Sequence, residues 1–170
     1  MACRLFLQRV VLFSALALAP PLAYAVHTCT IGVGTLNFGA YTGAQTNSSS
    51  IMTISCTLTA GIIDTVNYTA TLSTGTSGSY AQRRLTNLSL PSDTLPYNLY
   101  LGTVPAALNT SVWGDGTGGT VTASGTFTLI VFFAPVGTAT YTVAGAIAPL
   151  AAVPAAGTYN DTIIATLTFN

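Results

Sequence analysis

Met52-Thr53-Ile54-Ser55-Cys56-Thr57-Leu58 alternates apolar and hydroxyl-bearing side chains at every position. Successive side chains of a β-strand point to opposite faces, so this pattern predicts a strand with its four apolar side chains on one face. The same alternation occurs in Cys29 to Val33 and in Tyr68 to Leu72. Strands that bury one face therefore decide the fold.

The rest of the chain also favours strands and turns. Thr, Ser, Gly, Tyr and Val dominate after residue 26, whereas the helix formers Lys and Glu are absent. Further candidate strands, bounded by Gly, Pro, Asn or Asp, are Leu95 to Leu101, Thr126 to Phe133, Ala139 to Val143 and Thr158 to Phe169. About seven short strands in a single domain predict an all-β sandwich or barrel.

The first 25 residues are typical of a signal peptide. Arg4 and Arg9 precede an apolar run over residues 10–19, which is too short to span a bilayer comfortably, and Ala23-Tyr24-Ala25 supplies the small-x-small pattern of a cleavage site. We expect cleavage after Ala25, which leaves residues 26–170 as the mature domain.

The mature chain carries very little charge. Arg83 and Arg84 are its only basic residues other than the single histidine, and they stand against four aspartates, so its net charge is near −2. Such a surface cannot neutralise a row of phosphates or hold itself on anionic lipid, which argues against nucleic acid and peripheral membrane partners. Low charge also favours self-association, as in an assembly subunit.

Two cysteines, Cys29 and Cys56, remain after removal of the signal peptide. In an exported chain we expect them to pair, tying the first strand to the second inside the core. Closing this loop stabilises a fold by roughly 3 to 4 kcal/mol in the chain-entropy model. A metal site is not expected, because zinc needs four ligands and His27 is the only histidine.

No catalytic or cofactor-binding constellation is predicted. His27 is the second residue of the expected mature chain, where ends fray, and each aspartate stands in a turn-like setting that favours capping. The aromatic residues Tyr97, Tyr100 and Trp113 are interpreted first as packing residues, with a sugar-stacking platform as the alternative. We therefore expect neither an enzyme nor a small-molecule cofactor.

The segment Ala144 to Gly157 is rich in Ala and Pro and does not alternate. Its large apolar residues Ile147, Leu150 and Val153 either pack onto the edge of the sandwich or face outward as an adhesive patch. Packing is the prediction, since large exposed apolar patches are uncommon on soluble domains.

Several local patterns agree with one family in their order and spacing. They are Phe38-Gly39-Ala40-Tyr41, Thr53-Ile54-Ser55-Cys56, Leu95-Pro96-Tyr97-Asn98-Leu99-Tyr100, Trp113-Gly114-Asp115-Gly116, and the closing stretch from Pro154 to Thr162. Together they resemble the spore coat protein U domain, over about Cys29 to Phe169.

That resemblance implies an immunoglobulin-like β-sandwich that lacks its final strand. The family includes subunits of archaic chaperone-usher pili, which act in adhesion and biofilm formation, and a spore coat protein. It implies export to the periplasm and then to the cell surface or a pilus. The partners it implies are a periplasmic chaperone, an outer-membrane usher and neighbouring subunits, with the missing strand supplied by the chaperone and later by a neighbour.

The end of the sequence is consistent with such a gap. Ile163, Ala165, Leu167 and Phe169 alternate with residues of the opposite face, and no strand follows them. If this strand lies at a sheet edge, its apolar row and unpaired backbone need a cover. We expect these four residues, with Ile31 and Val33 across the gap, to line an acceptor groove.

The N-terminal side predicts an acceptor rather than a donor. Only Val26, His27 and Thr28 precede Cys29 after the expected cleavage, whereas a donated strand needs roughly ten residues. This favours a terminal or tip-type subunit. The alternatives are a self-contained spore or cell-surface coat protein and, from the aromatic residues, a carbohydrate-binding module.

Overall fold

Nine β-strands and one short 3-10 helix form the part of the chain that this computed structural model describes, residues 25–152 and 154–170. The elements are β1 (Val26–Val33), β2 (Thr46–Ala60), β3 (Ile63–Leu72), η1 (Gly75–Ser77), β4 (Arg83–Asn87), β5 (Thr94–Leu101), β6 (Ala123–Ile130), β7 (Val136–Ile147), β8 (Tyr159–Asn160) and β9 (Ala165–Phe169). Nearly all of the expected signal peptide lies outside the described residues. Within them, no helix has the length and apolar character needed to cross a membrane.

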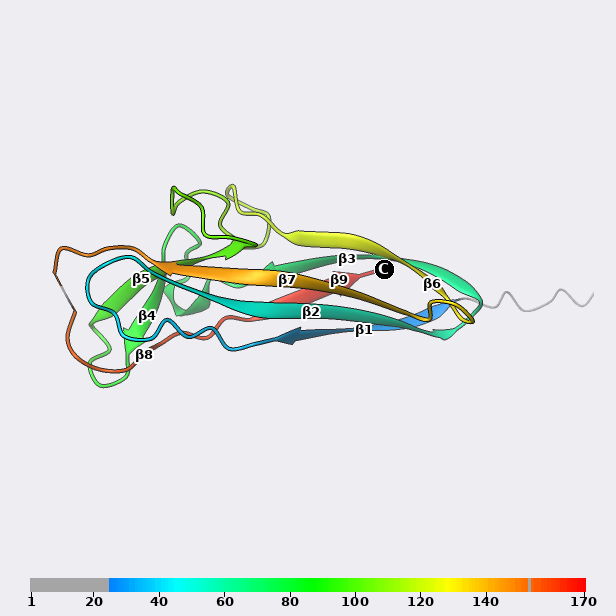
Figure 1. Ribbon diagram of the computed structural model, residues 1–170, viewed down its shortest axis with the longest axis horizontal. Coiled ribbons are helices and arrows are strands. Elements are labelled where there is room, and N and C mark those ends of the chain that lie inside the picture. Colours follow the sequence, from blue (N-terminus) through cyan, green and yellow to red (C-terminus); the bar gives the residue numbers. More distant parts are fainter. Residues whose placement is uncertain (1–24, 153) are drawn as a thin grey trace, which may run out of the picture.

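The strands form two antiparallel sheets that pack into an elongated sandwich (Figure 1). One sheet has the order β1-β2-β7-β5-β4-β8, and the other has the order β6-β3-β9. The four apolar side chains of β2 that the sequence predicted to share a face are buried between the sheets, as are alternate residues of β3. The predicted all-β sandwich is therefore confirmed.

The structure departs from the predicted strands in three places. β4 was not predicted, because its first two residues are arginines. The predicted strand from Thr126 to Phe133 begins earlier, at Ala123, and ends at Ile130, where the chain turns. The predicted strand from Thr158 to Phe169 is divided into β8 and β9. Between these two strands, Asp161 bonds to other parts of the chain and interrupts the ladder.

The Ala-rich segment after residue 143 packs largely as predicted. β7 continues through it to Ile147, which is buried, and its small residues allow close approach to the sheet. Leu150 is partly buried against the core, and its N–H donates to Gly43 O at 3.0 Å. Val153 lies outside the described residues.

Arg83 is the largest buried polar side chain, and its guanidinium joins three segments. It donates to Asn98 Oδ1 at 2.9 Å, to Ser73 O at 3.0 and 2.8 Å, and to Trp113 O at 2.7 Å. Burial lowers the pKa of Arg83. The carbonyl oxygens around it replace the water that a buried cation loses, and the ring of Tyr80 lies 5.2 Å from the guanidinium carbon.

We expect Arg83→Ala to lower the free energy of unfolding by about 3 to 5 kcal/mol, because it strands buried acceptors that have no access to water. The neighbouring Arg84→Ala is the matched control, since Arg84 is exposed, and it should change the value by less than about 0.5 kcal/mol. Urea unfolding followed by tryptophan fluorescence measures both. Equal effects of the two substitutions would contradict the bonding role of Arg83.

Candidate functional site

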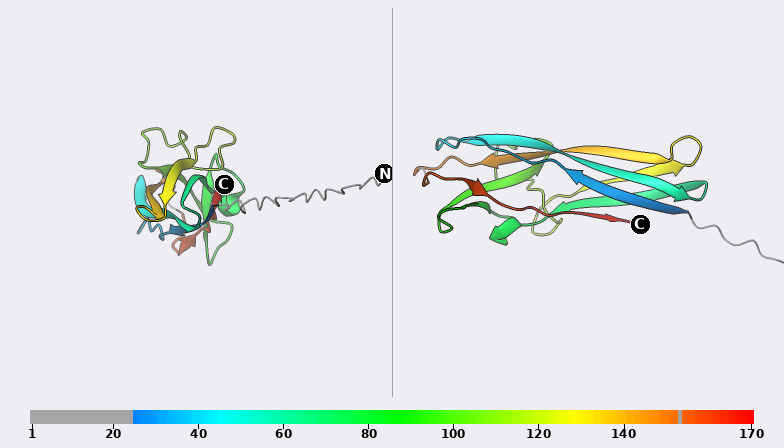
Figure 2. Two further views of the ribbon diagram at one scale, coloured as in Figure 1. Left: turned by 90° about the vertical axis from the view of Figure 1, so that its right-hand side faces the viewer. Right: turned by 90° about the horizontal axis from the view of Figure 1, so that it is seen from below.

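The two sheets leave an open seam along one side of the sandwich. β1 is an edge strand of the larger sheet and β9 is an edge strand of the smaller one. The two strands lie next to each other, and they run in opposite directions without forming a ladder (Figures 1 and 2). The seam is therefore bounded by two strands that each have one neighbour only.

The six residues predicted to line an acceptor groove are brought to this seam. Ile31 and Val33 lie on β1. Ala165, Leu167 and Phe169 lie on β9, and Ile163 lies two residues before β9. None of them is fully buried, since Val33 is 49% and Phe169 41% exposed and the other four are partly buried against the core. The structure thus brings the six residues together along one seam, and their role as an acceptor groove stays a prediction.

The backbone of β9 directs unpaired groups into the seam. Ser73 N donates to Ile164 O at 2.9 Å, and Asn170 N donates to Asn67 O at 3.3 Å, so the even-numbered residues from 164 to 170 face β3. Backbone groups of alternate residues point to opposite sides of a strand. The odd-numbered residues therefore direct both N–H and C=O toward the seam. They are Ala165, Leu167 and Phe169.

The backbone of β1 is arranged in the same way. Gly34 N donates to Ile51 O at 3.0 Å, which continues the register in which even-numbered residues of β1 face β2. Ile31 and Val33 then direct their backbone groups into the seam. Cys29 and Cys56 are direct partners in this ladder with Cα atoms 4.0 Å apart, as expected for a pair without mutual backbone hydrogen bonds.

The seam widens into two adjoining hollows away from the start of β1. The first has a volume of about 220 Å³ and lies between Val33 to Phe38 on one side and Ile163 and Ala165 on the other. The second has a volume of about 710 Å³ and continues along residues 35–41 and 154–161. Together they extend the seam into a groove with apolar walls.

Sequence analysis missed the wall formed by Leu36 and Phe38. Both side chains are partly buried, and the ring of Phe38 lies edge-on to Tyr97 with centroids 5.9 Å apart. Leu36 and Phe38 are out of phase with Ile31 and Val33, so the alternation of β1 does not extend to them. Phe38 had been quoted only for the family resemblance, and Leu36 had been given no role.

Asp161 closes one wall of the groove through polar contacts. Its carboxylate accepts from the Tyr97 hydroxyl at 2.8 Å and from Thr76 N at 2.9 Å. Burial, with the hydrogen bond to Asp161, raises the pKa of Tyr97 well above its usual range. The carboxylate therefore ties the segment before β9 to β5 and η1.

The predicted capping role of the aspartates is confirmed for one residue and is too narrow for the others. Asp115 accepts from Thr117 N at 2.9 Å within its own turn, and these local bonds lower the pKa of Asp115. Asp93 instead accepts from Ala155 N and from the Tyr159 hydroxyl, more than 60 residues along the chain. Most of the acidic side chains thus join distant segments.

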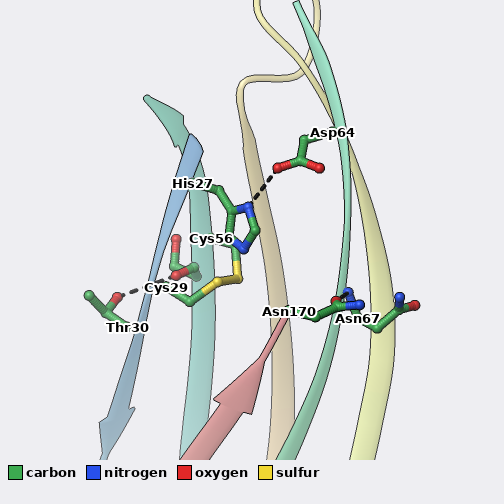
Figure 3. Close-up of a disulfide and its surroundings, with 8 residues drawn as sticks. His27, Cys29, Thr30, Cys56, Asp64, Asn67 and Asn170 are labelled. Carbon is green, nitrogen blue, oxygen red and sulfur yellow. Dashed lines mark hydrogen bonds and ion pairs between the residues drawn. A yellow bond between two sulfur atoms is a disulfide. The ribbon is translucent and has the colours of Figure 1, made fainter. Parts of the chain in front are cut away.

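His27 is also better ordered than its position in the sequence predicted. Its Nδ1 lies 2.6 Å from Asp64 Oδ2 (Figure 3). The centroid of its ring lies 5.6 Å from that of Phe169. The expectation of a frayed end is wrong here because β1 pairs with β2 from Val26 onward. The predicted disulfide between Cys29 and Cys56 is confirmed. Cys29 lies two residues after His27, on the same face of β1.

The sugar-stacking alternative is wrong for the residues that suggested it. Trp113 is 0% exposed, Tyr100 1% and Tyr97 6%, so none presents a ring face to a ligand. Trp113 donates from Nε1 to Ala70 O inside the core, and Tyr100 bonds to Leu108 O. These aromatic side chains pack the sandwich, as the first interpretation held. Among the described residues, no three His, Cys, Asp or Glu gather as a metal site.

The fold and the seam define a class: a disulfide-linked β-sandwich in which an edge strand of each sheet, paired on one side only, faces the same seam. A family model for the spore coat protein U domain matches residues 14–166. The chain belongs to the spore coat protein U domain family. Among curated proteins, none matches the sequence.

Two solved structures resemble the fold. One is the CsuC-CsuE chaperone-tip adhesion subunit pre-assembly complex from archaic chaperone-usher Csu pili of Acinetobacter baumannii, with a TM-score of 0.53 and 19% identity over 84% of this chain. This chain spans 40% of the chain it matches there. The other is a chaperone-tip adhesin complex of CFA/I fimbriae biogenesis, with a TM-score of 0.43 and 12% identity over 82% of this chain and 41% of that one.

The alternation of backbone direction in β9 can be tested by hydrogen exchange. We expect the amides of Ala165 and Leu167 to exchange roughly a hundredfold faster than those of Thr166 and Thr168 in the free protein, since only the latter are bonded to β3. Exchange measured residue by residue with NMR checks this. Equal protection along the whole strand would mean that the seam is closed.

Proposed function

We propose that this protein is a structural subunit of a secreted surface fibre that is completed by a β-strand from another polypeptide. The observation that carries the proposal is the seam, where two edge strands direct apolar side chains and unpaired backbone groups into the same groove. Exposed edges of this kind pair with other chains unless they are covered. An added strand would bond to both edges and bury the apolar row.

Family membership and fold support the partners in this proposal. The spore coat protein U match covers most of the chain, and the first structural neighbour is a subunit held in a complex with its chaperone. By analogy, a periplasmic chaperone would supply the strand first and a neighbouring subunit would replace it, with an outer-membrane usher guiding the exchange. The route is export to the periplasm and then to the surface. In this role the protein is not an enzyme.

A tip-type position is favoured by the N-terminal strand. β1 pairs with β2 from Val26 onward, so the described N-terminal residues are engaged in the chain's own sheet. A strand held in this way accepts a neighbour on its other edge rather than being donated. The proposal therefore places the subunit where it receives a strand.

We expect Leu167→Asp to abolish recovery of a complex with the candidate chaperone when both are expressed in the periplasm. The substitution would place a charge in the apolar row of the groove, where burial without a partner is costly. Thr168→Asp is the matched control, because Thr168 is the next residue and is exposed on the opposite face. Co-purification on a chaperone tag measures both.

Retention of the chaperone by the Leu167→Asp variant would count against the groove. A mature wild-type domain that is stable and monomeric without any partner would instead favour a self-contained coat protein. The two experiments together separate a complete fold from an incomplete one.

A role in adhesion, and through it in biofilm formation, is supported by an apolar tip at the end of the sandwich where β1 begins. The turn from β2 to β3 and the turn from β6 to β7 meet there, joined by a hydrogen bond from Val131 N to Ile62 O at 3.0 Å. Phe132 is 83% and Phe133 87% exposed, and Ile62 and Ile63 are exposed beside them. This convex surface suits contact with a flat apolar target better than capture of a small ligand.

We expect the double substitution of Phe132 and Phe133 by Ser to reduce adsorption of the purified protein to octyl-coated beads by about tenfold, since two exposed aromatic side chains supply most of the apolar contact. The matched control replaces Leu88 and Leu90 by Ser, because these residues are also exposed but lie in the turn after β4. Adsorption is read as protein left in solution. An equal loss of adsorption in both variants would contradict a role of the apolar tip in adhesion.

A further inference from the structure

The groove is open at one end and closed at the other. Near Ile163 the edges are separated by the first hollow. At the opposite end, the side chain of His27 crosses from β1 toward β3, and its Nδ1 lies 2.6 Å from Asp64 Oδ2 (Figure 3). His27 and Asp64 are each mostly buried, with side chains 12% and 20% exposed.

This crossing lies over the last residue of β9. The rings of His27 and Phe169 have centroids 5.6 Å apart and an interplanar angle of 59°. β9 is held in place beneath them, because Asn170 Oδ1 accepts from Asn67 N at 2.8 Å and fixes its end to β3. The backbone at Phe169 therefore cannot shift away from β3 without breaking this bond.

The contact occupies the space that an added strand would need. Hydrogen-bonded strands lie about 4.8 Å apart, so a strand bonded to both edges requires about twice this separation between them. At this level the side chains of His27 and Phe169 lie against each other across the seam and fill the space between the two strands. Beside Ala165 no such contact fills the seam, and the first hollow lies between Val33 and Ala165.

We propose that His27, held by Asp64 over Phe169, is a stop that limits how far an incoming strand pairs along β9. The inference rests on the proposed strand-accepting function. The occupant is a β-strand of another polypeptide with alternating apolar residues. It bonds to the backbone of Ala165 and Leu167, and it reaches Phe169 only when the contact between His27 and Asp64 opens.

The stop predicts a particular dependence of binding on peptide length. Two synthetic peptides serve as probes, with five and nine alternating Val and Thr residues and a Lys at either end. Wild-type protein should bind both with equal affinity, because the extra residues find no free edge. His27→Ala and Asp64→Ala should each bind the longer peptide about tenfold more tightly, the gain expected from one or two further backbone hydrogen bonds. Thr28→Ala, an exposed neighbour, is the control and should match the wild type.

Hydrogen exchange on the wild-type complex tests the same point without any substitution. With the nine-residue peptide, the amides of Ala165 and Leu167 should gain protection, and the amide of Phe169 should not. Protection of Phe169 in the wild type, or no gain in affinity in either folded variant, would overturn the stop and leave strand acceptance intact. No protection at Ala165 and Leu167 with either peptide would overturn strand acceptance itself, and the stop with it.

Discussion

Every peptide group in a β-sandwich needs a hydrogen-bond partner, and this constraint governs the molecule described here. β1 and β9 satisfy it on one side only, toward β2 and β3. The residues whose backbone groups remain unpaired are also those with inward apolar side chains, because both properties follow the same period of two. Water can form hydrogen bonds with the unpaired backbone groups, but it cannot bury the apolar side chains. A strand added at these edges would supply both the hydrogen bonds and the apolar contact.

A sandwich that leaves one seam open has to be held together elsewhere. The larger sheet provides this through the long pairing of β2 with β7, which runs over twelve residue pairs. Arg83 provides a second link, because its guanidinium donates hydrogen bonds to carbonyl oxygens of three segments. Asp161 and Asp93 then tie the C-terminal segment to β5 and to the turn before it. Among the described residues, most of the few charged side chains form bonds within the molecule.

The sequence was sufficient for the strands whose pattern is strictly periodic. β2 and β3 were predicted because burial on one face leaves an unbroken alternation. The disulfide was predicted because two cysteines remain in an exported chain, and their inward positions placed it in the core. β4 was missed because its core residue is an arginine, and an isolated sequence cannot show that carbonyl groups will surround it. The break between β8 and β9 was missed for a similar reason, since the partners of Asp161 lie far away in the chain.

The residues of the candidate site likewise fall into those that periodicity predicts and those that it does not. Its apolar walls on β1 and β9 could be predicted from periodicity, and their placement across a common seam agrees with the prediction. Leu36, Phe38 and the contact of His27 with Asp64 could not, because they depend on how a loop and a chain end fold back in three dimensions. The aromatic residues that suggested a sugar site are buried, which shows that residue type alone does not reveal exposure.

The position of the disulfide has a mechanical consequence. It joins β1 to β2 directly across their ladder, at the edge of the seam. A competing polypeptide therefore cannot strip β1 from the sheet, and any exchange of strands is confined to the vacant side. Tension applied to the N-terminal strand would likewise pass through a covalent bond into β2, and from there into the long pairing with β7, before any backbone hydrogen bond beyond Cys29 had to yield.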